Sequence, residues 1–490
     1  MKDKYFKLIV NILFILLVFV FIVKISPVIL QNDTLYDIKL GERYLNEGMF
    51  RLDDYSIHEG LKYQTHHYLV SIISYLVYDL FSYEGLYMLE LLLVSIIAFL
   101  FYLLNKTFMK DKLLIYLFLF IELFALLPFI SLRAQMYSYI IFMIEILFIE
   151  RYLNTNKPSY LIGLTLLPFL LINLHSGVIY FYYIIIGTYL LNIININYII
   201  TNDKRMTYNK FKYIIITIII SLLLTLINPY NIDALTYGLK TLDSSLISNY
   251  INEFQPLNIS TNTGITSIFI IFIYLISLIK SKKNIKIHEL LLFIGTIYMT
   301  FTSIRHFSLF IITSVVVLRH IEGFYRLFNT CICNIYNYLN KGINIIVIFI
   351  IYLILLSYLI YSIINRSYNM LPTKIYPVNA TKYIKDNKIE GNIFNRYNWG
   401  SYLMFNDIKV FIDSRCDLYT PEYNINTTVM QDYIDIMNKN KDYKGIVFKY
   451  KIKYFLLHIN DRLVNKLNKD ENYKIIYMDN TSVIIKNIGN

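Results

Sequence analysis

QNDTLYDIKLGERYLNEG, residues 31–48, directly follows the first apolar run of the chain and determines how the rest is interpreted. It brings three carboxylates, Asp33, Asp37 and Glu42, into one short segment of a mostly apolar chain. One interpretation is a solvated loop that opens an amphipathic helix, with Asp33 and Thr34 as its N-cap. The other is that Asp33 lies at the membrane surface as a general base, beneath a pocket that the rest of the chain builds over it.

The composition is that of a membrane protein. Of 490 residues, 56% are hydrophobic and 16% are charged, whereas a typical soluble domain is about 25% charged. Residues 5–23 are too long for a signal-peptide core and lack a small-residue cleavage site, so we expect a retained helix there. The net charge of +12 resides in short loops between apolar runs. This distribution is typical of membrane topology and argues against a nucleic-acid partner.

Charge and hydropathy together predict about eleven transmembrane helices, because roughly 20 apolar residues cross a bilayer core. Lys2, Lys4 and Lys7 precede the first helix, which places the N-terminus in the cytoplasm. Residues 67–82 are apolar but short and contain Asp79, so we expect an interfacial or re-entrant helix. The predicted spans are residues 5–23, 86–104, 113–130, 136–149, 160–173, 178–195, 213–227, 265–279, 290–304, 308–318 and 343–364.

The predicted organisation is therefore a polytopic α-helical domain, residues 1–364, with a first outer loop at 24–85, followed by an outer tail, residues 365–490. The tail contains more polar residues and short apolar stretches of strand length. Predicted strands are 392–394, 410–412, 454–457, 475–478 and 482–485, and predicted helices are 378–385 and 431–437. This alternation indicates a small extracytoplasmic α/β domain on a plasma-membrane protein.

Polar side chains of mixed type gather in the loops on the predicted outer side, whereas the inner loops hold mainly Lys and Arg. An arginine at the centre of a membrane helix costs about 2.5–3.5 kcal/mol, so Arg133 and Arg305 should lie at the interface or bind an anion. Either one could simply snorkel to the surface. Alternatively, their guanidinium groups have the geometry to bind phosphate.

The histidines of these loops have two interpretations. His66 and His67 could face water at the start of a helix, or one of them could contact a phosphate or help to hold a metal. His175 and Asn173, at the end of another helix, could be satisfied polar residues or part of the same site, and His306 adjoins Arg305. Their spacing does not match a strong metal motif.

At this point the residues resemble a known family. The run DTLYDIKLGERYLNEG is similar to the first outer loop of GT-C glycosyltransferases, polytopic enzymes that use polyprenyl-phosphate-linked sugars, and Asp33, Leu45 and Gly48 match its pattern. An uncharacterised bacterial group of the same superfamily is more similar still, over most of the chain. Its pieces appear here as LDDYSIHEG, QTHHYL, SLRAQMYSY, INLHSG, NPYNIDALTY, NYINEFQP, RHF, IFNRYNWGSYL and VFIDSRCDLY. The chain has His67 where that group usually has Glu, and Phe254 where it usually has Trp.

The resemblance implies an inverting sugar transfer at the outer face, with Asp33 as the general base and the lipid phosphate as the leaving group. Residues implied to bind the donor phosphate or substrate are Arg133, Arg305, His306, His66, His67, Asn173, His175 and Glu253. Residues implied to support the site or meet the acceptor are Asp37, Glu42, Trp399, Asp413 and Arg415. Trp399 could equally be a core aromatic residue, and Asp413 and Arg415 could merely pair at a strand end.

The implied partners are the lipid bilayer, a polyprenyl-phosphate-linked sugar, and a glycan, lipid or protein acceptor. No cofactor is certain, and a divalent metal is possible. Two other functions remain open: a transporter or flippase of lipid-linked sugars, and a non-catalytic assembly protein of the cell envelope. The absence of visible internal repeats weighs against a transporter.

Overall fold

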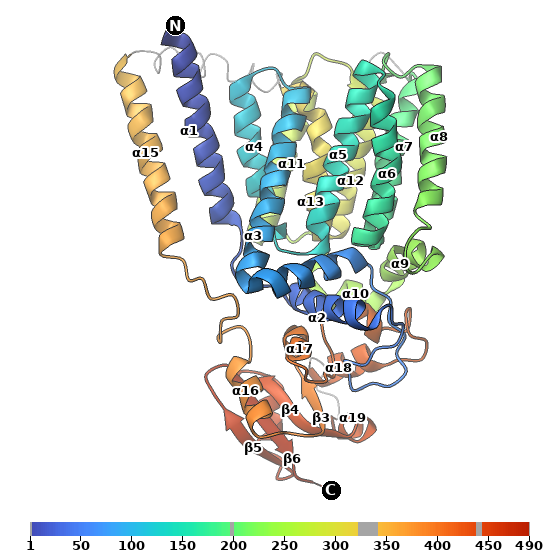
Figure 1. Cartoon of the computed structure of the whole chain (residues 1–490), viewed down its shortest axis with the longest axis vertical. Coiled ribbons are helices and arrows are strands. Elements are labelled where there is room, and N and C mark those ends of the chain that lie inside the picture. The colour runs from blue at the N-terminus through green and yellow to red at the C-terminus, as the bar shows by residue number, and fades with distance from the viewer. Residues whose placement is uncertain (1, 197–199, 322–341, 438–442, 490) are drawn as a thin grey trace.

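Upright helices, a crosswise layer and a sheet domain follow one another along the long axis of the molecule (Figure 1). The structure is a computed structural model that describes residues 2–196, 200–321, 342–437 and 443–489. The chain begins at the end of the helix bundle farthest from the sheet domain, here called the free end, and finishes in the sheet domain.

The bundle accounts for all the apolar segments that the sequence predicts. Each of the eleven predicted segments coincides for most of its length with a helix, in places continued by a short 3-10 turn. The helices are α1 (Lys2–Ile25), α3 (Tyr68–Phe108), α4 (Lys112–Leu126), α5 (Ala134–Thr155), α6 (Pro158–His175), α7 (Ile179–Leu190), α8 (Tyr208–Leu224), α11 (Asn262–Lys280), α12 (Ile287–Thr302), α13 (Phe307–Ser314) and α15 (Gly342–Ile364).

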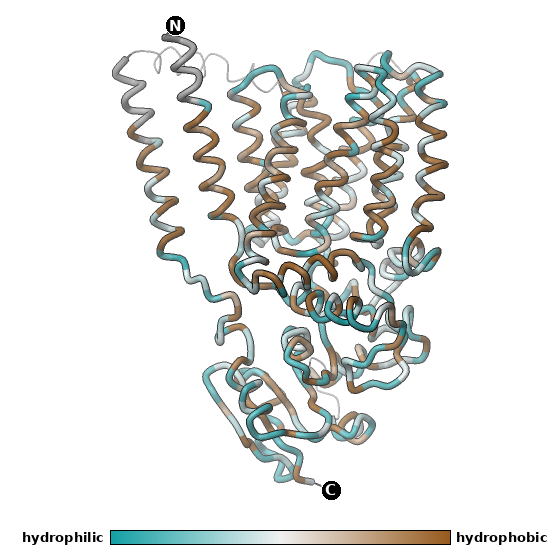
Figure 2. The backbone as a smooth tube through the Cα atoms, viewed as in Figure 1, coloured by the Kyte–Doolittle hydropathy of each residue, from teal (hydrophilic) through white to brown (hydrophobic). Residues whose placement is uncertain are grey.

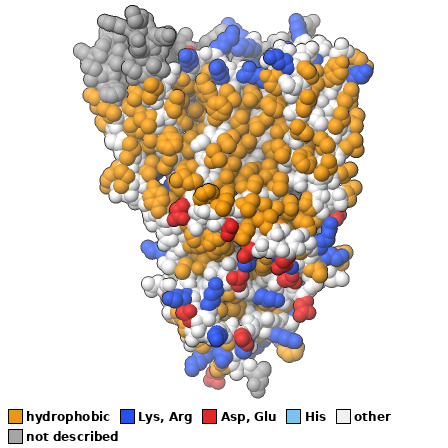
Figure 3. Space-filling view, in the orientation of Figure 1, with side chains coloured by type: hydrophobic (Ala, Val, Ile, Leu, Met, Phe, Trp, Pro, Cys, Tyr) orange, Lys and Arg blue, Asp and Glu red, His pale blue; other side chains and the backbone are white. Residues whose placement is uncertain are grey.

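Most residues of these helices are hydrophobic (Figure 2), and apolar side chains cover the face of the bundle that Figure 3 shows, as a lipid environment requires. Within the described residues, three segments are long and apolar enough to cross a membrane: Tyr68–Phe108, Pro158–Ile193 and Asn262–Lys280. Lys and Arg line the free end of the bundle, and acidic and basic side chains mix at the other end (Figure 3).

A break at Ser82 divides α3 into a crosswise arm and an upright helix. Ser82 has a positive φ of 54°, outside the helical region, which explains the sharp change of direction. The prediction of a separate short helix at residues 67–82 agrees with this break. The arm packs on α2 (Asn32–Glu47), and Gly41 makes the contact feasible, because a Cβ there would collide with the Ser71 carbonyl.

The tail is built on a four-stranded sheet with the order β3-β4-β6-β5. β3 pairs parallel with β4, and β6 lies antiparallel to both β4 and β5. The strands are β3 (Asn392–Asn395), β4 (Ile452–His458), β5 (Tyr473–Met478) and β6 (Ser482–Asn487). The helices are α16 (Val378–Asp386), α17 (Tyr397–Phe405), α18 (Val429–Met437), α19 (Tyr443–Lys449) and α20 (Arg462–Leu467).

The prediction of a strand at 410–412 is wrong. Val410 makes only an isolated parallel bridge with Ser56, and its backbone N–H and C=O bond to the Tyr55 carbonyl and the Ile57 amide at 3.1 and 2.9 Å. The segment is apolar because it is fully buried between the tail and the first loop. A buried extended segment has the same apolar pattern as a short central strand.

The first loop and the tail share one hydrophobic core. Tyr36, Leu40 and Tyr44 of α2 are buried in the same cluster as Phe394, Trp399 and other tail residues. The helix that carries Asp33, α2, therefore forms part of the surface on which the tail packs. The division of the chain at residue 364 remains a prediction.

Two further helices, α9 (Ile232–Asp243) and α10 (Ser245–Tyr250), join α2 in the layer between bundle and tail (Figure 1). At the free end of the bundle, a separate set of ion pairs ties the loops together. Arg205 contacts Glu150 at 2.7 Å, and Lys286 contacts Asp203 at 2.5 Å. The residues of the predicted site thus lie at the end that faces the tail.

Candidate active site at the tail-facing end of the bundle

Asp33, Arg133 and Glu253 form a continuous chain of ion pairs. Arg133 Nη2 lies 2.6 Å from Asp33 Oδ2, and Arg133 Nη1 lies 2.5 Å from Glu253 Oε1. Asp33 is in the first turn of α2, Arg133 caps the start of α5, and Glu253 belongs to the 3-10 turn η4 (Asn252–Phe254). The sequence analysis singled out each of these three residues separately. In the structure, their three segments, far apart in the chain, meet at the guanidinium of Arg133.

The capping role considered for Asp33 and Thr34 does not occur, because the N-cap position is occupied by Gln31. The Thr34 hydroxyl instead donates to the Leu132 carbonyl at 2.7 Å, in a buried bond. This bond fixes the start of α2 against the segment that carries Arg133. Asp33 is left to face the cation.

The charge of Arg133 is secured by its two carboxylates. Burial disfavours the charged form, but Asp33 and then Glu253 outweigh it and hold the pKa of Arg133 well above its ordinary value. Conversely, burial would raise the pKa of Glu253, and Arg133 and Arg305 together lower it. The trio carries a net charge of −1, and Asp33 Oδ1 has no partner among the residues that the structure describes.

Arg305 is the second cation of the site. It lies in the 3-10 turn η5 (Ile304–His306) with its guanidinium 4.4 Å from the centre of the Phe254 ring. The Ser303 hydroxyl donates to the Glu253 carbonyl at 3.0 Å, which ties η5 to η4. In the described part of the chain, the guanidinium of Arg305 has no hydrogen bond or ion pair. An arginine that is partly buried and unpaired is suited to bind an anionic ligand.

Asp37 follows Asp33 by one helical turn and is bound to His67. His67 Nε2 lies 2.8 Å from Asp37 Oδ1, and the Ser71 hydroxyl donates to the same oxygen at 2.5 Å. Burial lowers the pKa of His67, but Asp37 and, more weakly, Asp33 outweigh this, and the net pKa is raised above 6.5. The pair, together with the Ser71 hydroxyl, holds α2 on the arm of α3.

His66, His175 and Tyr237 form an aromatic cluster beside this pair. The His66 ring lies 4.1 Å from the ring of His67, 5.7 Å from that of His175 and 4.6 Å from that of Tyr237. Burial lowers the pKa of His66 well below its ordinary value, and the neighbouring charges of His67, His175, Arg305 and Arg133 lower it further. His66 is therefore neutral near pH 7.

Other predicted residues have side chains committed to structural bonds. The Asn173 amide donates to the Phe169 and Ile227 carbonyls at 2.9 and 3.1 Å, joining α6 to the end of α8. His306 Nδ1 lies 3.1 Å from the Met299 carbonyl. Burial, and then Arg305, lower the pKa of His306 to about 4. The Ser138 hydroxyl lies 2.7 Å from His175 Nδ1, which leaves the other ring nitrogen toward the cluster.

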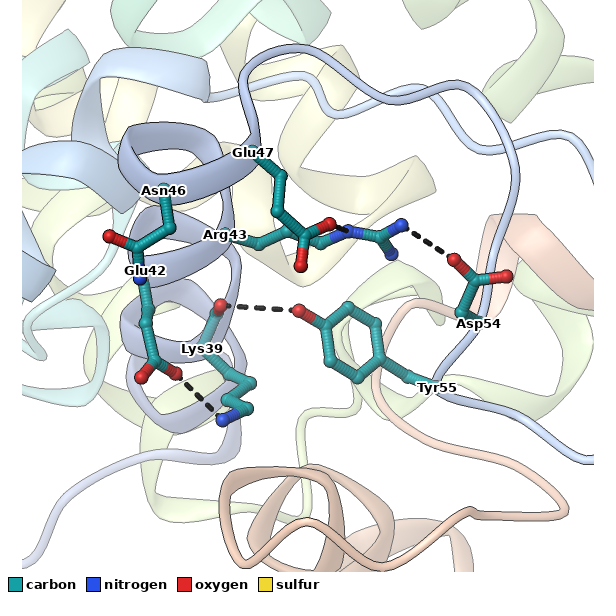
Figure 4. Close-up of a pocket in the computed structure, with 7 residues that line it drawn as sticks. All are labelled: Lys39, Glu42, Arg43, Asn46, Glu47, Asp54 and Tyr55. Carbon is teal, nitrogen blue, oxygen red and sulfur yellow. Dashed lines mark hydrogen bonds and ion pairs between the residues drawn. The ribbon is translucent and has the colours of Figure 1, made fainter.

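Glu42 lies on the far side of α2 from Asp33, since positions 33 and 42 are half a turn apart at 3.6 residues per turn. It lines a hollow of about 390 Å³ and pairs with Lys39 at 2.7 Å (Figure 4). In the same hollow, Arg43 bridges Glu47 and Asp54. The structure thus separates Glu42 from the Asp33 cluster.

Trp399, Asp413 and Arg415 lie inside the tail. Trp399 is 2% exposed and its Nε1 donates to the Ile375 carbonyl at 2.8 Å. Arg415 Nη2 contacts Asp413 Oδ2, and Arg415 Nη1 contacts Asp53 Oδ1, both at 2.7 Å, with all three side chains buried. These residues hold the first loop on the tail.

Two residues of the cluster were missed from the sequence. Tyr237 ends the fragment NPYNIDALTY and Asp417 lies in the fragment VFIDSRCDLY, but neither residue was given a role. The Tyr237 hydroxyl donates to Asp417 Oδ2 at 2.6 Å. Burial raises the pKa of the Asp417 carboxyl, although Tyr237 lowers it in part. The two residues are 180 positions apart, so no local sequence pattern predicts their contact.

The sequence left open whether the site holds a divalent metal ion. Across the described ranges, no group of three or more His, Cys, Asp or Glu side chains is placed to hold a metal ion. The carboxylates nearest the cluster are instead bound to Arg133 and His67. We therefore derive no step through a metal.

The fold is similar to that of an archaeal oligosaccharyltransferase. The oligosaccharyltransferase of Archaeoglobus fulgidus in its apo form is similar with a TM-score of 0.61 and 11% identity, over 92% of this chain and 69% of that one. AglB of the same organism, in complex with an inhibitory peptide and a dolichol-phosphate, is similar with a TM-score of 0.57 and 10% identity, over 93% and 70%. At these identities the likeness establishes the fold, and with the apolar helices it places the chain in a membrane. No family model and no curated protein matches the chain.

Proposed function

We propose that the chain is an inverting glycosyltransferase that moves a sugar from a polyprenyl-phosphate donor to an acceptor on the outer face of the plasma membrane. The observation that carries this proposal is the pairing of Asp33 with Arg133 beside an unpaired Arg305. One oxygen of Asp33 is held and the other is open. A proton acceptor and an anion site therefore lie together at one end of the bundle.

In the proposed reaction, the acceptor hydroxyl attacks the anomeric carbon from the face opposite the leaving group. A new C–O bond forms while the bond from that carbon to the lipid phosphate breaks, and the electron pair of the broken bond leaves with the phosphate. Asp33 Oδ1 takes the proton of the attacking hydroxyl, as a positioned general base. Arg305 stabilises the charge that develops on the phosphate.

Arg133 orients Asp33 in this scheme. A guanidinium bound to Asp33 alone would oppose protonation of that carboxylate, because it favours the ionised form. Glu253 shares the same guanidinium through its other nitrogen, at 2.5 Å. The surplus negative charge of the trio leaves Asp33 able to accept a proton while its direction stays fixed.

The donor and acceptor classes follow from the same site. Arg305 and the histidine cluster suit a phosphate at the membrane surface, and the dolichol-phosphate in the similar AglB structure supports a lipid carrier. A glycan, a lipid or a protein is the acceptor, and no nucleic acid takes part.

The first experiment incubates the purified full chain in lipid nanodiscs with a panel of polyprenyl-phosphate sugars and acceptors. We expect at least one donor to release free polyprenyl phosphate in an acceptor-dependent way, measured by mass spectrometry. Movement of a lipid-linked sugar between leaflets without release would instead identify a transporter. Binding without either outcome would identify an assembly protein.

We further propose a topology of eleven spans with the N-terminus in the cytoplasm and the tail outside. The Lys and Arg side chains at the free end of the bundle support it (Figure 3). In a background lacking the three native cysteines, Asn46→Cys should react with an impermeant maleimide in intact cells. Lys282→Cys, at the other end of the bundle, should react only after permeabilisation. The reverse pattern would overturn the topology.

A further inference from the structure

A buried contact joins the tail to the histidine cluster. Asp417 lies in the 3-10 turn η7 (Cys416–Tyr419) of the tail and accepts the Tyr237 hydroxyl at 2.6 Å. The ring of Tyr237 stacks on His66 with the two planes at 27°. Asp417, Tyr237 and His66 are therefore in contact one after another, from the tail through α9 to the cluster. The charges of Arg305 and Arg133 contribute to the lowered pKa of the His66 imidazole.

The position of Tyr237 is fixed from two sides. Next to it, Gly238 lies so close to the turn after α6 that a Cβ would be 2.5 Å from the Gly177 carbonyl oxygen. From the tail, the Tyr423 hydroxyl donates to the Tyr237 carbonyl at 2.8 Å. These contacts fix the backbone at Tyr237, and the bond from its hydroxyl to Asp417 fixes the direction of the ring.

His66, by contrast, depends on its neighbours for orientation. His66 is half-buried, and within the described ranges neither of its ring nitrogens has a hydrogen-bond partner. Tyr237 covers one face, the ring of His67 meets it at 88°, and His175 lies beside it. A neutral imidazole offers one N–H donor and one nitrogen acceptor, and their direction is set by the plane of the ring.

We propose that Tyr237 and Asp417 are positioning residues that aim the His66 N–H at the phosphate of the donor, so that the tail completes the phosphate site. This inference rests on the proposed function and deepens it. Arg305 and Arg133 supply charge, which acts over a distance, whereas His66 supplies one directed hydrogen bond. The tail is then part of the machinery that binds the donor.

The test measures binding of polyprenyl phosphate without sugar to the full chain in nanodiscs. Tyr237→Phe keeps the stacked ring and removes the hydroxyl, and Asp417→Ala removes its acceptor. We expect each to weaken binding by about 10-fold, which corresponds to about 1.4 kcal/mol. Asp417→Asn keeps an acceptor oxygen and should bind as wild type. Tyr477→Phe removes a comparable hydroxyl, bonded to Asp479 at 2.8 Å elsewhere in the tail, and should have no effect.

A double-mutant cycle separates positioning from general damage. If Tyr237 acts through His66, Tyr237→Phe should cause no further loss in a His66→Ala background, because the two changes remove one effect. Additive losses would overturn the proposal. The same variants should also bind inorganic phosphate more weakly when it is titrated in parallel. If only the binding of polyprenyl phosphate is weakened, the variants act on the contact with the lipid chain and the proposal is overturned.

Failure of this inference is distinguishable from failure of the proposed function. Wild-type affinity in both Tyr237→Phe and Asp417→Ala overturns the positioning role and leaves the transferase proposal standing. A wild-type chain that binds no lipid phosphate overturns both.

Discussion

Asp33→Asn should abolish most of the sugar transfer while the donor still binds. An amide cannot take the proton of the acceptor hydroxyl, and a positioned general base contributes on the order of 10²- to 10⁴-fold to a rate. The amide oxygen can still accept from Arg133, so the start of α2 should keep its place. Donor affinity should be equal to wild type or higher, because Arg133 is less neutralised. Turnover and donor binding are measured on the same nanodisc preparation.

The chain offers a matched control on the same helix. Glu42→Gln makes the same kind of carboxylate-to-amide change on the opposite face of α2, where Glu42 pairs with Lys39. That variant should transfer sugar at the wild-type rate. Equal losses in the two variants would mean that the helix had been disturbed, and an active Asp33→Asn variant would remove Asp33 from the chemistry.

Arg415→Ala should detach the first loop from the tail. Arg415 is 3% exposed and pairs with both Asp413 and Asp53. Burial would raise the pKa of Asp53, but Arg415 and the Ser56 contacts lower it, so the carboxylate is charged in the folded protein. Removing one partner of a buried ion pair costs about 3–5 kcal/mol, because the remaining charge is left without compensation.

Hydrogen exchange on the full chain locates this effect, since local opening is reported separately for each segment. Protection should fall at residues 50–65 and 410–420 and stay unchanged in α5 and α6. Arg396→Ala is the comparison, because Arg396 is one-third exposed and lies 3.3 Å from Asp461. A pair at the surface is worth about 0–1 kcal/mol. A response to Arg415→Ala no larger than that would contradict the account.

The bundle was largely predictable from the sequence, because long apolar runs have few alternative structures. The break in α3 was also predictable, since Asp79 and the shortness of residues 67–82 spoke against a span. Asp33, Arg133 and Glu253 were each singled out as polar residues in outer loops. Their assembly around one guanidinium was not visible, because contacts between residues far apart in the chain leave no local pattern.

The limits of prediction from the sequence are clearer in the tail. Residues 410–412 resemble a strand because they are apolar, but they are buried between β3 and the first loop without joining the sheet. Trp399, the single tryptophan, was predicted either to support the site or meet the acceptor, or to be a core aromatic residue; its indole lies in the core with its N–H bonded to the Ile375 carbonyl. Tyr237 and Asp417 were overlooked because each becomes interesting only through its partner.

The anomeric configuration of the product tests the central claim most directly. A single displacement assisted by Asp33 inverts the configuration at the anomeric carbon, whereas a covalent sugar–enzyme intermediate retains it. NMR of the product formed by the wild-type chain from a donor of defined configuration should show the inverted anomer. A retained anomer, or inverted product formed equally fast by Asp33→Asn, would contradict the account.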